Sequence, residues 1–331
     1  MKHVLVIRFS AMGDVILASQ ISSFVVDSHE DIHLYVVTKT PFQALFQDHE
    51  RITLLDIDLK GQHKGIWGLR KWVSHIQQTY QIDLIIDLHH VLRSQIISFF
   101  FGLKGIPSYR LFKDRKGRKR LTRKKDKQLL PLTSITKEMA SVWERAGIKV
   151  PLQAIPQDTS LVRKGFIGIA PTASTPTKTY PLEKMKEVVR LLRSHRLQIV
   201  LFGGGKQDQA WAKELMIDDG VQSTIEGYSL QEQKNIMRGM ELLLSMDSSN
   251  MHLARSLGVP VLSIWGATHP SSGYGPYDQE DEDMIVAIPP SELLCRPCSI
   301  FGKKACYRDR MYCLEDIEPK VIVKKVIDQI Q

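Results

Sequence analysis

The chain begins MKHVLVIRFSAMGDVILASQ over residues 1–20, and this stretch decides the class of fold. Val4 to Ile7 is a short apolar run, Asp14 to Val26 is a helix candidate, and a turn containing the single glycine Gly13 joins them. A buried strand that leads through a tight turn into a helix is the first unit of an α/β protein with a parallel sheet. Because only one glycine is present, the turn lacks the G-x-G-x-x-G pattern, which disfavours a nicotinamide-type first domain.

The same alternation continues along the chain and restarts after a linker. Further strands are predicted at Leu34 to Val37, Ile52 to Leu55 and Leu84 to Asp87, and then at Phe166 to Ala170, Gln198 to Phe202, Leu242 to Ser245 and Val259 to Trp265. The periodicity lapses around residues 151–164, PLQAIPQDTSLVRK, which predicts the linker. We therefore expect an α/β protein of two Rossmann-like domains, residues 1–155 and 156–331, that face each other across a cleft. The second domain closes with a helix over Pro319 to Ile330.

Composition excludes several classes of protein. The chain has 331 residues, of which 43% are hydrophobic and 24% charged, an ordinary balance that argues against a disordered, collagenous or coiled-coil protein. No apolar stretch approaches the roughly 20 residues that a spanning helix needs. Arg8 and Asp14 interrupt what would be the apolar region of a signal peptide. We expect a cytoplasmic protein, which leaves open a contact with a membrane surface.

The positive charge is concentrated in one segment. Residues 113–127, KDRKGRKRLTRKKDK, hold ten Lys or Arg against two Asp, so this segment carries +8 of the net +9. A solvated surface loop, a polyanion site and a contact with anionic lipid headgroups all fit this pattern. A nucleic-acid-binding α/β protein is the alternative reading of the whole chain, although the segment has no interleaved aromatic residues and we expect no nucleic acid as a partner.

Polar residues follow the strands of the second half, at the edge where ligands of parallel sheets bind. Hydroxyl residues and Lys178 come after the strand that ends at Ala170, and they suit a phosphate as well as a solvated loop that caps the next helix. Asp208 follows the triglycine of residues 203–205 and is placed to accept hydrogen bonds from a ribose. The candidate residues of this group are Thr172, Ser174, Lys178 and Asp208.

A second polar group leads directly from a strand into a helix at residues 245–252, SMDSSNMH. Free backbone N–H groups at such a helix start form an anion site. Asp247 suits a turn-fixing role or a contact with substrate hydroxyls better than direct anion binding, and His252 is read either as a packed histidine or as a ligand contact. The candidates are Asp247, Ser248, Ser249, Met251 and His252.

All four cysteines fall within nineteen residues, with the spacing C-x2-C-x7-C-x6-C. Four thiols this close can surround a tetrahedral zinc ion, and packed free thiols are the alternative, since disulfides are rare in the cytoplasm. If a structural zinc is present, its ligands are Cys295, Cys298, Cys306 and Cys313.

Three of these stretches together resemble one known family. VLVIRFSAMGDVILAS (4–19) is similar to the N-terminal motif of glycosyltransferase family 9, the ADP-heptose:lipopolysaccharide heptosyltransferases. TKTYP (177–181) is similar to its lysine-containing motif, and MDSSNMHLARSLGVPVLSIWGATHP (246–270) to its second hallmark. The three blocks occur in the family's order over nearly the full chain.

The resemblance implies a GT-B fold with an N-terminal acceptor-binding domain and a C-terminal nucleotide-sugar-binding domain. It implies inverting transfer of a heptose from an ADP-sugar to the lipopolysaccharide inner core, with no cofactor required. Asp14 matches the family's general base, whereas from the residues alone it also reads as a helix N-cap. Ser174 and Lys178 match diphosphate-binding residues, and Asp208 and Asp247 match ribose and donor contacts.

The implied partners are the nucleotide sugar and a lipid-linked acidic glycan at the anionic inner leaflet. The basic segment would bind that acceptor or the membrane surface, through Arg118, Lys119, Arg120, Lys124 and Lys125. The sequence departs from the family pattern at two places. Ser248-Ser249 stands where the family usually has Thr-Gly, and Ala267 and His269 replace the Pro and the Asp of the usual Gly-Pro-Thr-Asp-Pro. These departures leave the identity of the donor sugar open.

Overall fold

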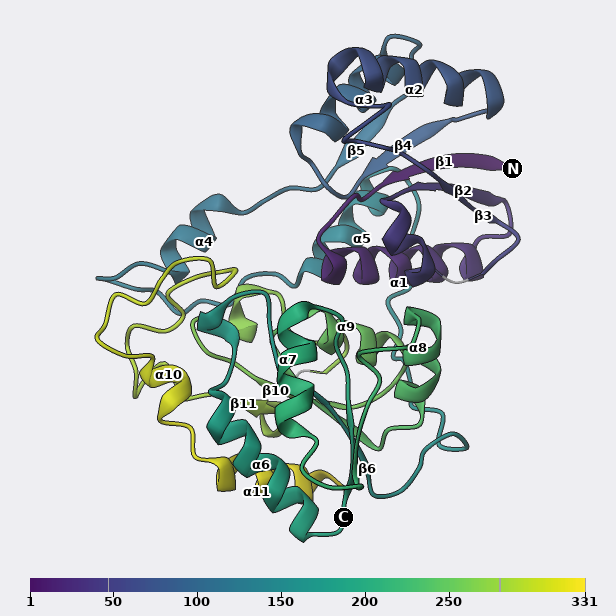
Figure 1. Ribbon diagram of the computed structural model, residues 1–331. Helices are drawn as coiled ribbons and strands as arrows, with labels where there is room; N and C mark the ends of the chain where they lie inside the picture. The colour runs from purple at the N-terminus through teal and green to yellow at the C-terminus, as the bar shows by residue number, and fades with distance from the viewer. Residues whose placement is uncertain (47, 280, 331) are drawn as a thin grey trace. The chain divides into compact units, whose positions relative to one another are not determined.

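The computed structural model describes residues 1–46, 48–279 and 281–330 (Figure 1). Its contacts divide the chain into two compact units. Unit 1 comprises residues 1–113 and 135–153, and unit 2 comprises residues 114–134 together with the chain from residue 154 onwards. Each unit is built on one parallel sheet with helices packed on it, so the α/β class predicted from the alternation is confirmed.

Unit 1 holds a five-stranded sheet of strand order β3-β2-β1-β4-β5. Val4 of the central strand pairs with Leu34 on one side and with Leu84 on the other, all strands running parallel. The strand order reverses between β1 and β4, which makes their carboxyl ends the place where such a sheet offers a crevice to a ligand. The strands are β1 (Lys2–Ile7), β2 (Ile32–Val37), β3 (Ile52–Leu55), β4 (Leu84–Asp87) and β5 (Ser108–Arg110).

Helices cover both faces of this sheet. On one face α2 (Gly65–Thr79) and α3 (Leu92–Gly102) lie side by side (Figure 1). On the other face α1 (Met12–Ser28) packs against α5 (Ile135–Arg145). Alternate residues of the strands point to each face, so both helical layers have an apolar surface to cover. The core under α2 and α3 includes Leu5, Ile7, Leu69, Trp72, Ile97 and Phe101.

Unit 2 holds a six-stranded parallel sheet of strand order β11-β10-β9-β6-β7-β8. Its order reverses between β6 and β9, which are hydrogen-bonded neighbours in register from Ile167 with Leu242 to Ala170 with Ser245. The carboxyl ends of these two strands are therefore the corresponding ligand edge. The strands are β6 (Phe166–Ala170), β7 (Gln198–Leu201), β8 (Val221–Ser223), β9 (Leu242–Met246), β10 (Val261–Ile264) and β11 (Ile285–Val286).

Two groups of helices pack on this second sheet. One apolar core joins the strands to α6 (Leu182–Ser194), α7 (Lys206–Leu215), α10 (Tyr312–Glu315) and α11 (Pro319–Ile330). The other helices, α8 (Leu230–Arg238) and α9 (Ser249–Ser256), contact each other, and α9 packs on β9 and β10. None of the helices in the described residues has the length and apolar character needed to cross a bilayer.

The basic segment folds differently from the loop that its composition suggests. Residues 115–121 form a helix, α4 (Arg115–Leu121), whose start is capped by the Asp114 carboxylate accepting from the Gly117 N–H at 2.8 Å. Leu121 is fully buried beneath it. The contacts group residues 114–134 with unit 2, whereas the sequence placed them in the first half of the chain.

Candidate functional site

The first cluster lies where β1 and β4 end in unit 1. Asp14 occupies the third position of α1, and Ala11 is the N-cap residue. Asp14 is therefore not the N-cap of this helix, which was the other role that the sequence left open for it. The Asp14 carboxylate instead pairs with the Arg8 guanidinium, which also donates to the Leu88 carbonyl. The Arg8 side chain is 7% exposed and that of Asp14 is 19% exposed. The pair thus presents its carboxylate, and not its guanidinium, to solvent.

A histidine that the sequence reading did not single out completes this cluster. The N–H of Phe9 donates to the Nδ1 of His89 at 3.4 Å, and the two rings meet edge to face with centroids 5.4 Å apart. The Asp87 carboxylate fixes the loop by accepting from the N–H groups of His89 and His90 and from the Ser94 hydroxyl. The sequence signal that could have identified His89 is the doublet His89-His90, which closely follows the predicted strand Leu84 to Asp87.

The charge around His89 is strongly positive. Burial, followed by the neighbouring cations Arg8, Lys113 and Lys39, lowers the pKa of His89 from 6.5 to about 3. Because its Nδ1 accepts from Phe9, the neutral ring carries its proton on Nε2. This edge of unit 1 therefore combines the carboxylates of Asp14 and Asp87 with the neutral imidazole of His89 and the three cations.

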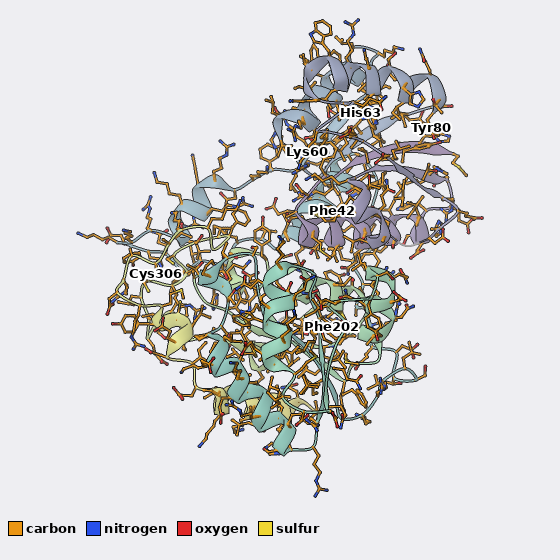
Figure 2. All side chains as sticks on the ribbon, in the orientation of Figure 1. Phe42, Lys60, His63, Tyr80, Phe202 and Cys306 are labelled. Carbon is orange, nitrogen blue, oxygen red and sulfur yellow. The ribbon has the colours of Figure 1, made fainter. Side chains whose placement is uncertain are left out.

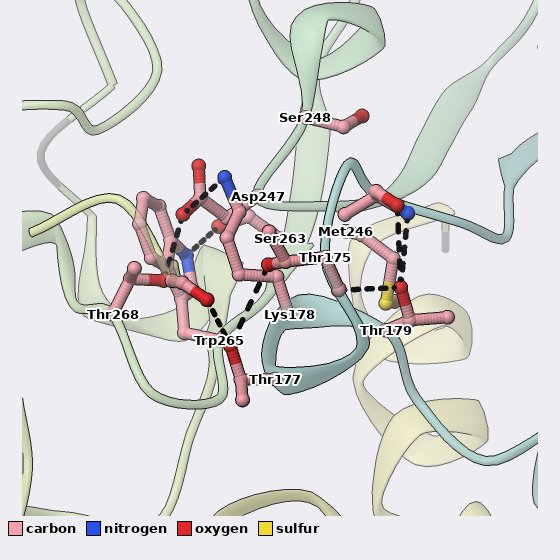
Figure 3. Close-up of polar contacts among 12 residues, drawn as sticks. Thr175, Thr177, Lys178, Thr179, Met246, Asp247, Ser248, Ser263, Trp265 and Thr268 are labelled. Atoms are coloured by element: carbon pink, nitrogen blue, oxygen red, sulfur yellow. Dashed lines mark hydrogen bonds and ion pairs between the residues drawn. The ribbon is translucent and has the colours of Figure 1, made fainter. Parts of the chain in front are cut away.

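The second cluster lies where β6 and β9 end in unit 2 (Figure 3). Lys178 stands in the short 3-10 turn Pro176–Lys178, and its Nζ lies 3.0 Å from the Oδ2 of Asp247. The same oxygen accepts from the Thr268 hydroxyl at 2.7 Å. The side chains of Lys178 and Asp247 are 11% and 9% exposed. The sequence predicted both residues, and the structure joins them in one ion pair at the switch point of the sheet.

The turn that carries Lys178 is held by hydroxyl groups. Thr179 donates to the Thr175 carbonyl at 3.0 Å and accepts from the Ala173 N–H at 3.2 Å. Thr177 donates to the Gly302 carbonyl at 2.5 Å, and Gly302 packs so closely on the Lys178 stem that a Cβ there would lie 2.5 Å from the lysine Cδ. Ser174 is exposed at the open side of the turn. The hydroxyls thus position the lysine, and Ser174 stays accessible to a ligand.

Asp208 is engaged with its own loop. Its Oδ2 accepts from the N–H groups of Gly204 and Gly205 at 2.9 and 2.8 Å, and its Oδ1 accepts from the Thr172 hydroxyl. Asp208 therefore acts here as the cap of α7 and ties the loop after β7 to the loop after β6. The contact of Asp208 with a ribose remains a proposal, as does the contact of Thr172 with the nucleotide sugar.

The start of α9 resembles the predicted anion site in one respect. Ser248 is the N-cap residue and makes no capping hydrogen bond with its side chain, while Ser248 and Ser249 are half-buried. The backbone N–H groups of the first turn are therefore open to a ligand. Met251 is fully buried and His252 is 6% exposed, so the side chains of these two residues face the interior. Met251 can offer a ligand only its backbone N–H.

Part of the basic segment is engaged with aromatic rings of unit 2. The Arg118 guanidinium lies 5.8 Å from the ring centroid of Tyr274 and 5.5 Å from that of Phe301, and the Lys124 Nζ lies 4.2 Å from that of Tyr307. Arg120 is half-buried, whereas Lys119 and Lys125 are exposed. The segment is thus anchored to unit 2 through some cations and leaves others to solvent.

The four cysteines line a single small pocket, together with the buried Arg296. Cys306 lies in the long loop before α10 (Figure 2). Burial raises the pKa of Cys298, and it raises that of Cys313 to about 12. All four thiols are free, and among the described residues no group of three or more His, Cys, Asp or Glu side chains is arranged to hold a metal ion. The structure thus gives no support to the zinc alternative within the described residues, and zinc binding by these four thiols stays a prediction.

Comparisons with known proteins agree with these motifs. The sequence model of glycosyltransferase family 9 (heptosyltransferase) matches residues 73–302. Lipopolysaccharide heptosyltransferase 1 of Campylobacter coli is 25% identical over 288 residues, which cover 80% of this chain and 83% of the relative. The lipopolysaccharide core heptosyltransferase OpsX of Haemophilus influenzae is 23% identical over 305 residues, covering 86% and 84%.

The solved structures show the same fold. The Escherichia coli heptosyltransferase WaaC with ADP-2-deoxy-2-fluoro heptose aligns over 99% of this chain and 100% of its own, with a TM-score of 0.71 and 16% identity. The two-sheet α/β architecture is accordingly a GT-B fold, as the motifs led us to expect.

Proposed function

This chain belongs to glycosyltransferase family 9, and from that premise we propose that it transfers a heptose or a related sugar from an ADP-sugar to the inner core of lipopolysaccharide. The two curated relatives described above are named for this substrate class. The observation that carries the proposal is the Lys178–Asp247 pair beside the open start of α9, since this is the arrangement that a diphosphate donor needs.

The donor binds to unit 2 through its phosphates. The Lys178 ammonium and the exposed Ser174 hydroxyl contact the diphosphate, and the backbone N–H groups near Ser248 to Met251 donate to it. Asp247 does not contact the anion; it holds Lys178 in place. Asp208 and Thr172 orient the loops on either side, with Asp208 accepting from the ribose.

The reaction is a single displacement with inversion at the anomeric carbon. The acceptor hydroxyl oxygen forms the new bond to that carbon, its proton passes to the Asp14 carboxylate, and the bond to the diphosphate oxygen breaks to release ADP. Arg8 holds the Asp14 carboxylate in place through their ion pair. An ordinary carboxylate suffices as base because the hydroxyl proton becomes acidic only as the new bond forms.

The charge that develops on the leaving diphosphate is stabilised by fixed groups of the protein. Lys178, Ser174 and the N–H groups of α9 supply the positive field that other enzymes obtain from Mg²⁺. The proposed reaction therefore requires no metal.

The acceptor is a lipid carrying acidic groups, and the basic segment recognises them at the cytoplasmic face of the inner membrane. The cations that serve this purpose are Arg118, Lys119, Arg120, Lys124 and Lys125. Replacing all five by Ser should weaken binding to anionic liposomes while leaving ADP affinity unchanged. Unaltered liposome binding would return the segment to a structural role.

A nucleic-acid-binding function has no support in the structure. Tyr274, Phe301 and Tyr307 hold cations of the basic segment over their rings, so these rings are engaged within the protein. The family match accounts for the same residues without it.

The test of the proposed function is a thermal-shift panel with ADP-heptose, UDP-sugars and GDP-sugars, followed by a transfer assay. A ligand that binds the folded protein raises its melting temperature. We expect the largest rise with ADP-heptose. No rise with any ADP-sugar, together with no transfer, would overturn the proposal.

A further inference from the structure

Helix α3 carries apolar side chains on the side that faces solvent. Leu92, Phe99 and the following Leu103 are 73%, 61% and 68% exposed, and they are spaced seven and four residues apart, which places them on one stripe. Ile97 and Phe101, on the opposite side of the helix, are fully buried against the sheet. A helix that is apolar on all sides is ordinarily buried on all sides. The outer stripe of α3 is instead exposed to solvent, which is typical of a surface that another molecule covers.

The neighbouring helix adds two more exposed side chains to the same layer. Ile66 and Trp67, in the first turn of α2, are 52% and 69% exposed. Because α2 and α3 pack side by side on one face of the sheet, these residues belong to the outer surface of a single helical layer (Figure 1). We call this surface the α2–α3 face, defined by Ile66, Trp67, Leu92, Phe99 and Leu103.

The formal charges within α2 and α3 are all positive, whereas the Asp58 carboxylate, in the loop before α2, accepts from the N–H groups of that loop. Residues 59–82 and 88–113 contain no Asp or Glu, although Asp and Glu number 36 in the chain. The exposed cations of these ranges, none of which forms an ion pair within the described part of the chain, are Lys60, Lys64, Arg70, Lys71, Arg93, Lys104 and Arg110. Lys60 lies in the loop that leads to α2 (Figure 2). A partner that covers this face must accept apolar side chains and supply negative charge.

We propose that the α2–α3 face docks on the surface of an anionic phospholipid bilayer. The leucines, the isoleucine and the phenylalanine enter the acyl boundary, Trp67 lies at the headgroup level, and the lysines and arginines contact lipid phosphates. An apolar centre with a rim of one sign fits a lipid surface better than a protein partner, whose interface rim mixes both signs.

The topology places this face beside the reactive residues of unit 1. In a parallel sheet each helix starts at the carboxyl edge of the strand before it. Ile66 and Trp67 open α2 and Leu92 opens α3, so they lie at the edge that also carries Asp14 and His89. A bilayer in contact with this face would present the sugar of a lipid-linked acceptor to that edge. This consequence rests on the proposed function, whereas the docking itself does not.

The first experiment measures sedimentation with vesicles of equimolar phosphatidylcholine and phosphatidylglycerol, and with vesicles of phosphatidylcholine alone. The triple variant Trp67→Ser, Phe99→Ser, Leu103→Ser removes exposed side chains and leaves the core intact. We expect at least tenfold weaker binding to the anionic vesicles. The matched control, Leu161→Ser, Met216→Ser, Tyr228→Ser, changes exposed apolar residues of unit 2 and should bind within twofold of the unaltered protein. Equal binding by the two triple variants would overturn the proposal.

The second experiment uses Trp67 as a reporter of depth. Trp72, Trp143 and Trp265 are buried and Trp211 of unit 2 is half-buried, so vesicles that contain brominated phosphatidylcholine should quench mainly Trp67, which is 69% exposed. The quenching should disappear in Trp67→Phe, while that variant still binds vesicles. Quenching that persists in Trp67→Phe would show that another face meets the lipid and would refute the assignment.

Activity separates this proposal from the proposed function. The triple variant should transfer sugar to a deacylated, water-soluble acceptor at the unaltered rate and lose at least tenfold on acceptor embedded in vesicles. Absence of all transfer would overturn the proposed function and leave the vesicle data to decide the docking. Loss of self-association in the triple variant, with no vesicle binding by the unaltered protein, would identify the face as a protein contact and refute the proposal.

Discussion

The two switch points carry the same kind of ion pair in opposite arrangements. In unit 1 the cation is the more deeply buried partner, since the Arg8 side chain is 7% exposed and that of Asp14 is 19% exposed. In unit 2 both partners are almost equally buried, and Asp247 has a second donor in Thr268. Arg8 therefore serves to hold a carboxylate out toward a ligand, whereas Asp247 serves to hold a lysine. In the proposed mechanism the first edge takes a proton and the second holds an anion.

The strongest test of this contrast removes the basicity of Asp14. Asp14→Asn retains the size of the side chain and loses its capacity to accept a proton, so kcat should fall by about 10²–10⁴-fold. The affinity for ADP, measured by calorimetry, should stay within twofold because unit 2 is unchanged. A variant that turned over at nearly the original rate would show that another group is the base.

The matching change in unit 2 is Lys178→Ala. It removes the charge that neutralises the diphosphate in the transition state, and a loss of about 10²–10³-fold in kcat is expected, as for removal of one oxyanion donor. In contrast to Asp14→Asn, it should also raise the dissociation constant for ADP. If ADP bound as tightly as before, Lys178 would not be a phosphate ligand and the contrast between the two pairs would fail.

Each unit also has a histidine beside cations whose burial lowers its pKa. The pH dependence of the free energy of unfolding therefore gives a further test of the comparison between the units. Burial lowers the pKa of His89 to about 3 and that of His269 to about 4, with Arg296 next to the latter. Between these values and the ordinary 6.5, the unfolded chain binds protons that the folded chain does not, so the free energy of unfolding falls as the pH falls through that window.

Replacing either histidine by Gln should reduce this acid sensitivity. Denaturant titrations at pH 7 and pH 4.5 measure the difference, and the effect should be at least as large for His89→Gln as for His269→Gln because the pKa of His89 is the lower one. A slope with pH that neither substitution changes would show that carboxylates control the acid stability.

The smallest expected effect is that of chelation. Since in the proposed mechanism fixed groups of unit 2 stabilise the leaving diphosphate, EDTA should change the initial rate of transfer by less than twofold. A dialysed sample with and without added Mg²⁺ provides the control. Strong loss of turnover on chelation, restored by Mg²⁺, would contradict the role given to Lys178.

The elements that the sequence predicted share a clear signal. The predicted strands Ile52–Leu55, Leu84–Asp87 and Phe166–Ala170 have the observed bounds, because short runs of β-branched and leucine residues between polar turns fit buried parallel strands. The helix α3 was missed because its residues are apolar on both sides and show no helical period. The strands β5, β8 and β11 have two or three residues, too few for any pattern.

The candidate site divides in the same way. Asp14, Lys178 and Asp247 could be named from the sequence because each directly follows a predicted strand or its turn. Arg8 and His89 could not, since their roles depend on neighbours 80 residues away in the chain, Leu88 for Arg8 and Phe9 for His89. The engagement of Asp208 with Gly204 and Gly205 also emerged only from the backbone path of its loop.

The alternation of strand and helix, the family, and which polar residues follow the strands could all be predicted from the sequence, because hydrophobic period and local turn chemistry act over a few neighbours. Only the tertiary structure decided which cation holds which carboxylate, that the basic segment packs with unit 2, and that one side of α3 stays uncovered. These outcomes depend on strand order and helix packing, which bring together residues that lie far apart in the chain.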